Sequence, residues 1–194
     1  MYKKRGVIMR DVSKDLLLVI DVQNVYLPGE AWACPGSVAA ITGILKLLSS
    51  KNAPDALITQ YLPPVDPKGR WKNYNETYRD INENAYYNEL EARINTLARS
   101  GRYPLVQKDT YSALKHPQVQ KALEGKTTIV LTGVVAECCV LATMLDAIDL
   151  GYQVIYLTDC VAGQTPAKEA AALQIAGDFA PVHTLIMTSE EYLN

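Results

Sequence analysis

The sequence has no excess of charge of either sign, and it lacks a long apolar run. Its 194 residues include 19 basic and 21 acidic side chains, which leaves a formal net charge of −2. Proteins that bind nucleic acid or anionic membranes rely on a cationic face, so we expect neither partner. A membrane-spanning helix needs roughly 20 apolar residues, whereas the run 16–20 ends at Asp21. Residues 1–15 also lack a signal-peptide core. These observations predict a cytoplasmic protein.

The sequence also has no metal-binding or redox cysteine motif, and it has a single phenylalanine. The four cysteines form neither a C-x-x-C pair nor a zinc-finger spacing, so we expect reduced thiols. Cys138 and Cys139 are neighbours, between which a disulfide would be strained. One Phe is accompanied by twelve Tyr, and Tyr suits pockets and interfaces that are apolar on one side and wet on the other.

What is present is an alternation of apolar, β-branched runs with helical patterns. Strands are predicted at 16–20, 55–62, 104–108, 127–134, 153–159 and 183–189. Helices are predicted at 37–50 with Ser37 as N-cap, 83–101, 137–150 and 166–179, with a short helix at the C-terminal end. Strands that are apolar throughout indicate a parallel sheet covered on both faces. We therefore predict one α/β domain over 1–194, a three-layer α/β/α sandwich with a six-stranded parallel sheet.

The segment 63–82 is predicted to be a long irregular loop. It holds three prolines, Trp71 and two tyrosines. A loop of this length in a compact domain is usually functional. The alternative is a dimer arm or a surface excursion.

Three reactive side chains are predicted to meet at one edge of the sheet. Ligands of open parallel sheets bind outside the carboxyl ends of the strands. Asp21 ends the first strand, Lys108 ends the third, and Cys138 and Cys139 follow the fourth. Each residue alone has a plainer reading: Asp21 as a cap, Lys108 as a lysine reaching water, and the cysteine as an inert core residue. Their convergence favours a catalytic site.

The chemistry of such a site is coherent. A thiol at a helix N-terminus beside Lys108 should have a lowered pKa. Asp21 could take the thiol proton and later deliver it to a leaving group. Backbone N–H groups in the turn could hold an oxyanion. These arguments leave open whether Cys138 or Cys139 is the nucleophile, because both lie in the first helical turn.

Three stretches of the sequence resemble the isochorismatase-like cysteine hydrolase superfamily. They are "LLLVIDVQNVY" (16–26), "VQKDTYSAL" (106–114) and "LTGVVAECCVLATMLDAIDLGYQVIYLTDCVAG" (131–163). The resemblance implies an isochorismatase-like, Rossmann-like topology and a covalent mechanism without a cofactor. It implies the triad Asp21 (base, then acid), Lys108 (orienting) and Cys139, which lies six residues after Gly133. Homodimers or larger homo-oligomers are also implied.

The same resemblance implies further features of the site. It places a cis peptide bond between Val134 and Val135, and an oxyanion hole formed by the N–H groups of Val135 and Cys139. It also places Gln23 near the pocket as a hydrogen-bonding group.

Departures from the family pattern narrow the substrate. Nicotinamidases of the family carry metal-binding histidines after the second strand, where this chain reads "TQYLPPVDP". With only two histidines in the chain, His116 and His183, no metal is expected. True isochorismatases lack the nucleophilic cysteine, so Cys139 indicates cleavage of a carbon–nitrogen bond in a small amide, ureido or carbamoyl substrate.

The loop 63–82 is predicted to shape the substrate pocket. Trp71 and Tyr74 would form an aromatic wall, and Arg70 or Arg79 would bind a substrate carboxylate. Tyr111 would reach the pocket as well. The plainer alternatives are a subunit contact for Trp71 and a solvated loop for the arginines.

Three other functions stay open on the sequence. They are a non-catalytic binding module, a thiol redox protein that uses Cys138 with Cys139, and a nucleotide-binding protein. The last is disfavoured because no glycine-rich phosphate motif follows any strand.

Overall fold

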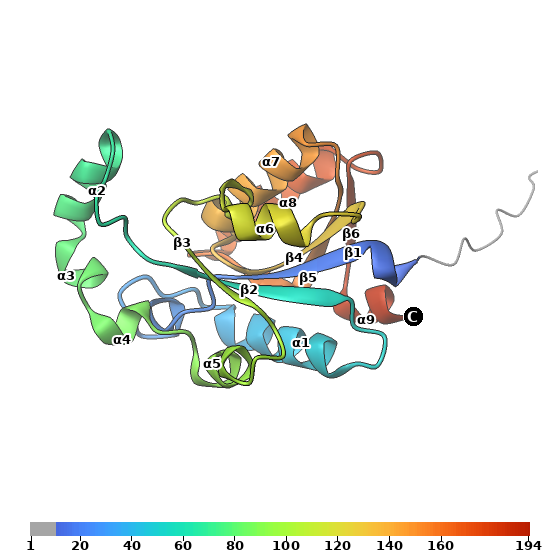
Figure 1. Cartoon of the computed structure of the whole chain (residues 1–194), viewed down its shortest axis with the longest axis horizontal. Helices are drawn as coiled ribbons and strands as arrows, with labels where there is room; N and C mark the ends of the chain where they lie inside the picture. The colour runs from blue at the N-terminus through green and yellow to red at the C-terminus, as the bar shows by residue number, and fades with distance from the viewer. Residues whose placement is uncertain (1–10) are drawn as a thin grey trace, which may run out of the picture.

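The computed structural model describes residues 11–194 and is built around a six-stranded parallel sheet (Figure 1). The strand order is β3-β2-β1-β4-β5-β6. The strands are β1 (Asp15–Ile20), β2 (Asp55–Tyr61), β3 (Leu105–Lys108), β4 (Thr128–Val134), β5 (Gln153–Ala162) and β6 (Thr184–Met187). Every strand pair is parallel, as continuous apolar strands predict.

Helices cover both faces of this sheet (Figure 1). One face is covered by α1 (Ser37–Ser49), α5 (Ala92–Arg99) and α9 (Ser189–Leu193), and the other by α6 (Pro117–Ala122), α7 (Leu141–Asp149) and α8 (Pro166–Asp178). Short turns are η1 (Val12–Lys14), η2 (Asn24–Tyr26), η3 (Ala113–Lys115) and the π-helical turn η4 (Ala136–Val140). The predicted α/β/α sandwich is therefore confirmed.

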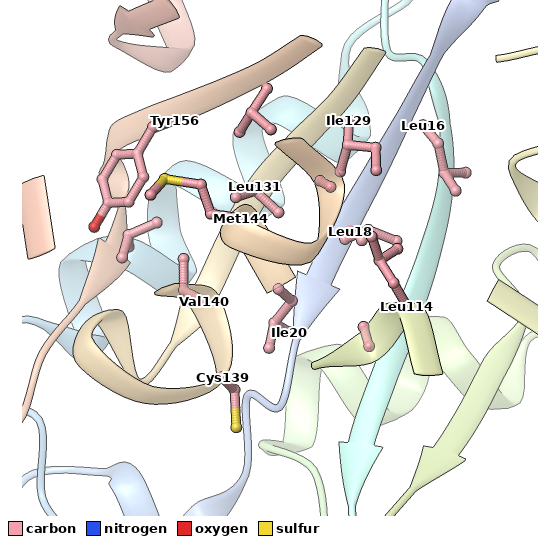
Figure 2. Close-up of a cluster of buried hydrophobic side chains, with 14 of the residues drawn as sticks. Leu16, Leu18, Ile20, Leu114, Ile129, Leu131, Cys139, Val140, Met144 and Tyr156 are labelled. Atoms are coloured by element: carbon pink, nitrogen blue, oxygen red, sulfur yellow. The ribbon is translucent and has the colours of Figure 1, made fainter. Parts of the chain in front are cut away.

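Strand β1 runs through the middle of two apolar cores. Leu16, Leu18 and Ile20 pack with residues of α6, α7 and α8, whereas Leu17 and Val19 pack with α1 and α5. Side chains of a strand alternate between the two faces of a sheet, so this one short apolar run contributes to the core on each face. Figure 2 shows the first core, with Cys139 at its edge beside the end of β1.

The predicted helix 83–101 is wrong as a single element. It is divided into α4 (Ala85–Asn88) and α5, because the chain between them pairs with the loop after β1. The N–H of Glu91 donates to the carbonyl oxygen of Val22 at 2.9 Å, and Leu90 forms a β-bridge with Gln23. The Glu91 carboxylate then caps α5.

The segment 63–82 is not an irregular loop throughout. It contains α2 (Arg70–Thr77) and α3 (Arg79–Asn82). All residues of α2 are at least partly exposed, so the segment lacks the apolar periodicity by which helices are recognised. With α4, these helices lie beyond the carboxyl ends of the strands, at the left of Figure 1.

Two smaller predictions also need correction. Ser37 is the first residue of α1 and Gly36 is its N-cap. The predicted helix 137–150 begins as the π-helical turn η4 before α7.

The strand order places a topological switch point between β1 and β4. Their outgoing chains turn to opposite faces there, which opens a crevice at the carboxyl edge. Asp21 follows β1 and η4 follows β4, so the predicted carboxylate and thiol leave adjacent strands. Within residues 11–194, no helix is long and apolar enough to cross a membrane.

Candidate active site

Asp21 is held at the end of β1 by its neighbour strand β2. Its backbone has a φ of +50°, in the left-handed region that non-glycine residues rarely adopt. The hydroxyl of Thr59 donates to Asp21 Oδ1 at 2.7 Å and accepts from the Asp21 N–H at 3.2 Å. Unusual backbone angles of this kind cluster at functional sites. The carboxylate is thereby fixed in one orientation and is inaccessible to water.

Lys108 reaches the same point from the end of β3. Its Nζ lies 2.6 Å from Asp21 Oδ2. It also donates to the carbonyl oxygens of Thr110 at 2.9 Å and Tyr111 at 3.0 Å. Burial alone would lower the pKa of Lys108, but the negative charge of Asp21 and the hydrogen bonds to Asp21 and Cys139 outweigh it and raise the pKa. The side chain therefore remains an ammonium.

Gly133 brings β4 against β1 just before the turn that carries the cysteines. Its φ is +103°, and a Cβ at this position would lie 2.1 Å from the carbonyl oxygen of Ile20. Only glycine allows this approach. The next residues form the peptide bond Val134–Val135, which is cis.

Cys139 lies in the π-helical turn, and its sulfur faces the ion pair. Lys108 Nζ is 3.5 Å from Cys139 Sγ. The Thr143 hydroxyl donates to the Cys139 carbonyl oxygen at 2.7 Å and accepts from the Ala113 N–H at 3.0 Å, which ties the turn to η3. Figure 2 shows the sulfur directed away from the apolar side chains of the core. Single π-helical turns are frequent at functional sites.

A half-open cavity of about 160 Å³ lies over Cys139. Six of its ten lining residues are aromatic. The lining residues are Tyr26, Trp32, Tyr61, Tyr74, Tyr78, Tyr111, Val135, Cys138, Cys139 and Gln164. The rings support one another: Trp32 lies 5.5 Å from Tyr78 and 6.2 Å from Tyr26 between centroids. The site therefore has a buried reactive cluster below a largely aromatic chamber.

Comparison with known proteins identifies the family. Residues 15–187 match the Isochorismatase domain family. The chain belongs to the isochorismatase family. The earlier resemblance is thereby confirmed, as is the prediction of an enzyme of this hydrolase family.

Several relatives of this isochorismatase-family chain are similar over most of its length. Maleamate amidohydrolase of Pseudomonas putida is 28% identical over 156 residues, which cover 76% of this chain and 72% of that protein. A cysteine hydrolase from Pseudomonas syringae pv. phaseolicola superposes with a TM-score of 0.81 at 20% identity, covering 100% of this chain and 97% of that one. A nicotinamidase/pyrazinamidase from Bacillus subtilis has a TM-score of 0.71 at 18% identity, covering 90% and 99%.

The expected low pKa of the thiol is wrong for this isochorismatase-family site. Burial raises the pKa of Cys139 well above the ordinary value of 9.0, and the negative charge of Asp21 raises it further. Lys108 opposes this shift but already neutralises Asp21, so a thiolate would leave an unbalanced negative charge in a buried place. In the resting protein Cys139 is therefore a thiol.

The predicted substrate contacts are only partly brought together. Tyr74 and Tyr111 line the cavity, whereas Trp71 packs behind them at 5.2 Å and 5.0 Å between ring centroids. Arg70 and Arg79 are exposed and do not line the cavity. The structure therefore does not bring either arginine to the cavity, and the idea that one of them binds a substrate carboxylate stays a prediction.

Gln23 is also not a cavity residue. Its amide nitrogen donates to the carbonyl oxygens of Tyr61 and Asn88, both at 3.0 Å. Its amide oxygen accepts from the Tyr61 N–H at 2.9 Å. The side chain thus joins the loop after β1 to β2, and its amide nitrogen and oxygen are both hydrogen-bonded to backbone groups.

Most of the aromatic wall was missed by sequence reasoning. Four of the six rings were not named from the sequence, because they come from separate elements and meet only in the folded chain: Tyr26, Trp32, Tyr61 and Tyr78. The non-aromatic lining residue Gln164 was not named either. The only sequence signal for this wall was general, the twelve tyrosines against one phenylalanine. Among residues 11–194, no group of three His, Cys, Asp or Glu side chains is arranged to hold a metal ion.

Proposed function

We propose that this isochorismatase-family protein hydrolyses a carbon–nitrogen bond of a small amide, ureido or carbamoyl compound through a thioester on Cys139. The observation that supports this most directly is the contact of one carboxylate, one ammonium and one thiol below an open cavity. Lys108 Nζ lies 2.6 Å from Asp21 and 3.5 Å from Cys139. The names of its relatives, an amidohydrolase and a nicotinamidase, favour amide chemistry.

The first step is attack by sulfur on the carbonyl carbon. Asp21 takes the proton of the Cys139 thiol, and Sγ forms a bond to the carbon as the carbonyl π electrons move to oxygen. The N–H groups of Val135 and Cys139 form the oxyanion hole. One such donor is typically worth about 3–4 kcal/mol of transition-state stabilisation.

The second step expels nitrogen and is followed by hydrolysis. The tetrahedral intermediate collapses, and Asp21 returns its proton to the departing nitrogen, which leaves as ammonia or an amine. A water molecule then gives a proton to Asp21 and attacks the thioester. As the acid is released, Asp21 returns this proton to the departing sulfur, which restores both the thiol and the carboxylate, so Asp21 serves twice as base and twice as acid.

Lys108 supports both steps without exchanging a proton. Its ammonium orients Asp21 through their contact at 2.6 Å, and it balances charge when the sulfur loses its proton. A raised pKa of Lys108 suits this role, because the ammonium persists over the working pH range.

The neighbouring thiols provide a matched test. Cys139→Ala should abolish ammonia release from small amides and ureas and remove the acyl adduct seen by mass spectrometry. Cys138→Ala, which removes the exposed neighbour, should retain turnover. Full activity in the first variant would refute the assignment. Peroxide consumption by wild type without amide cleavage would instead support a thiol redox function.

We also propose a cytoplasmic homodimer or larger homo-oligomer, following the family resemblance. Light scattering coupled to size-exclusion chromatography tests the assembly, and a monomer at micromolar concentration would contradict it.

A further inference from the structure

The aromatic cavity lacks any means of neutralising a charged substrate. Among the residues that the structure describes, its lining contains no Arg, Lys, His, Asp or Glu side chain. Burial raises the pKa of the lining phenols of Tyr26, Tyr61 and Tyr74, so these rings stay neutral. A charge that enters a site of this kind loses its hydration without gaining a partner.

The one buried cation beneath the cavity is fully engaged in the described structure. An ammonium has three N–H donors. Those of Lys108 have three short oxygen acceptors, Asp21 Oδ2 at 2.6 Å, Thr110 O at 2.9 Å and Tyr111 O at 3.0 Å. No donor remains for a substrate carboxylate unless one of these contacts breaks.

A second cation, Lys168, contacts a lining residue at the rim, and its charge is also balanced. Lys168 donates to Oε1 of the lining residue Gln164 at 2.6 Å. It does not itself line the cavity, and it lies 3.8 Å from the carboxylate of Glu137. Its charge is therefore offset outside the chamber.

The reaction moves negative charge from the Asp21 carboxylate toward the substrate. Asp21 and Lys108 cancel each other, but proton transfer and attack place a negative charge on sulfur and then on oxygen. A carboxylate on the substrate would repel this developing charge across a chamber whose aromatic faces are themselves electron-rich.

The size of the chamber sets a second limit. Its volume is about 160 Å³, and an apolar protein cavity of about 150 Å³ accepts one benzene molecule. The interlocked rings leave little room to expand, since Tyr74 contacts Trp32, Trp71 and Tyr78 at centroid distances of 6.4, 5.2 and 4.9 Å.

We infer that the protein selects an uncharged acyl group of about the size of one six-membered ring, and that it discriminates against carboxylate-bearing amides. This inference rests on the proposed function. It separates this chain from its relative maleamate amidohydrolase, whose name denotes an anionic amide. The aromatic lining, and not the exposed arginines of α2 and α3, determines the specificity.

Two pairs of matched probes test the inference on the full chain. The first is maleamate against its uncharged diamide, cis-butenediamide, which differ only in a carboxylate against an amide. After halving the diamide rate for its two equivalent amides, we expect its kcat/KM to be higher by at least about thirtyfold. That is the effect of one like charge at roughly 8 Å with an effective dielectric of about 20, and the two groups of the cis skeleton lie closer together than this. Equal values, or a preference for maleamate, would overturn the inference.

The second pair tests cation binding by the aromatic rings. Aromatic cages also attract cations, so 3-methylbenzamide is compared with the similarly shaped 3-carbamoyl-1-methylpyridinium ion. We expect the neutral amide to be hydrolysed at least as efficiently as the cation. A tenfold preference for the cation would overturn the inference.

A charge placed at the rim should alter this selectivity. Tyr111 lines the cavity with 39% of its surface exposed, and its backbone contact to Lys108 survives substitution. Tyr111→Arg should raise the ratio of maleamate to diamide efficiency relative to the neutral control Tyr111→Gln. An unchanged ratio would show that charge in the cavity does not set selectivity.

Binding measurements keep this inference separate from the proposed chemistry. In Cys139→Ala, calorimetry compares the affinities of the intact diamide and maleamate without turnover. If wild type hydrolyses no amide, the proposed function fails, yet tighter binding of the diamide would still support the selectivity. Tighter binding of maleamate would overturn it whatever the activity.

Discussion

Asp21 Oδ2 and Lys108 Nζ lie 2.6 Å apart, and both side chains are almost inaccessible to water. Asp21 follows β1 and Lys108 ends β3, and these two strands are not neighbours because β2 lies between them in the sheet. Lys108 spans this distance along the carboxyl edge, with its ammonium 5.5 Å from the centre of the Tyr61 ring. The same two side chains therefore contribute to the stability of the fold and to the proposed catalytic site.

Removing one partner of this pair should be more harmful than removing both. Lys108→Met leaves the Asp21 carboxylate buried without its ammonium, and we expect a loss of about 3–5 kcal/mol in the free energy of unfolding. The double variant Asp21→Asn/Lys108→Met should recover part of that loss, while all variants lack amidase activity. Urea unfolding measures the stabilities. A double variant less stable than Lys108→Met would contradict this account of the pair.

The raised pKa of Cys139 predicts slow alkylation in the resting protein. Because burial and Asp21 favour the thiol over the thiolate, its reaction with iodoacetamide at pH 7 should be slower than that of a free cysteine peptide. The rate should keep rising with pH beyond the ordinary thiol pKa of 9.0. The Cys138→Ala background and peptide mapping isolate the signal. Fast, pH-independent labelling between pH 6 and 8 would show a resting thiolate instead.

Gly133 should tolerate no side chain. A Cβ would fall 2.1 Å from the Ile20 carbonyl oxygen at a φ of +103°, so Gly133→Ala should lower the free energy of unfolding by at least about 3 kcal/mol. Gly151, with a φ of +85° and open space around it, is the control. Gly151→Ala should cost only about 1–2 kcal/mol of backbone strain. Thermal and urea unfolding compare the two, and equal losses would mean that the close approach is unimportant.

Thr143 is expected to position the nucleophile turn. Thr143→Val removes its bond to the Cys139 carbonyl and leaves the buried Ala113 N–H without an acceptor, which should cost about 1–3 kcal/mol. It should also lower kcat more than it raises KM, and Thr143→Ser should restore both properties.

The matched control for Thr143 is Thr42, whose hydroxyl makes a similar bond to the Val38 carbonyl at 2.9 Å on the exposed side of α1. Thr42→Val should change stability by less than about 0.5 kcal/mol and leave kcat unchanged. If Thr143→Val also left kcat unchanged, Thr143 would have a structural role only.

The sequence by itself determined the layers of this protein and the edge at which its chemistry lies. Continuous apolar strands such as Leu16–Ile20 require burial on both faces, and reactive residues directly after strands meet at the carboxyl edge of a parallel sheet. Asp21, Lys108 and the cysteine pair could be placed there because strand ends are local features. The prediction of one helix over 83–101 was wrong because Leu90 forms a β-bridge with Gln23 in the loop after β1, a partner that is far away in the sequence.

Only the tertiary structure decided the protonation of the thiol and the character of the pocket. Both depend on what surrounds a group in space: burial and the Asp21 charge reverse the expected pKa shift of Cys139. The six rings above it come from distant segments, and the exposed positions of Arg70 and Arg79 follow from where α2 and α3 lie. Local patterns indicate the strands and the longer amphipathic helices, whereas desolvation and charge balance depend on neighbours that only the folded chain brings together.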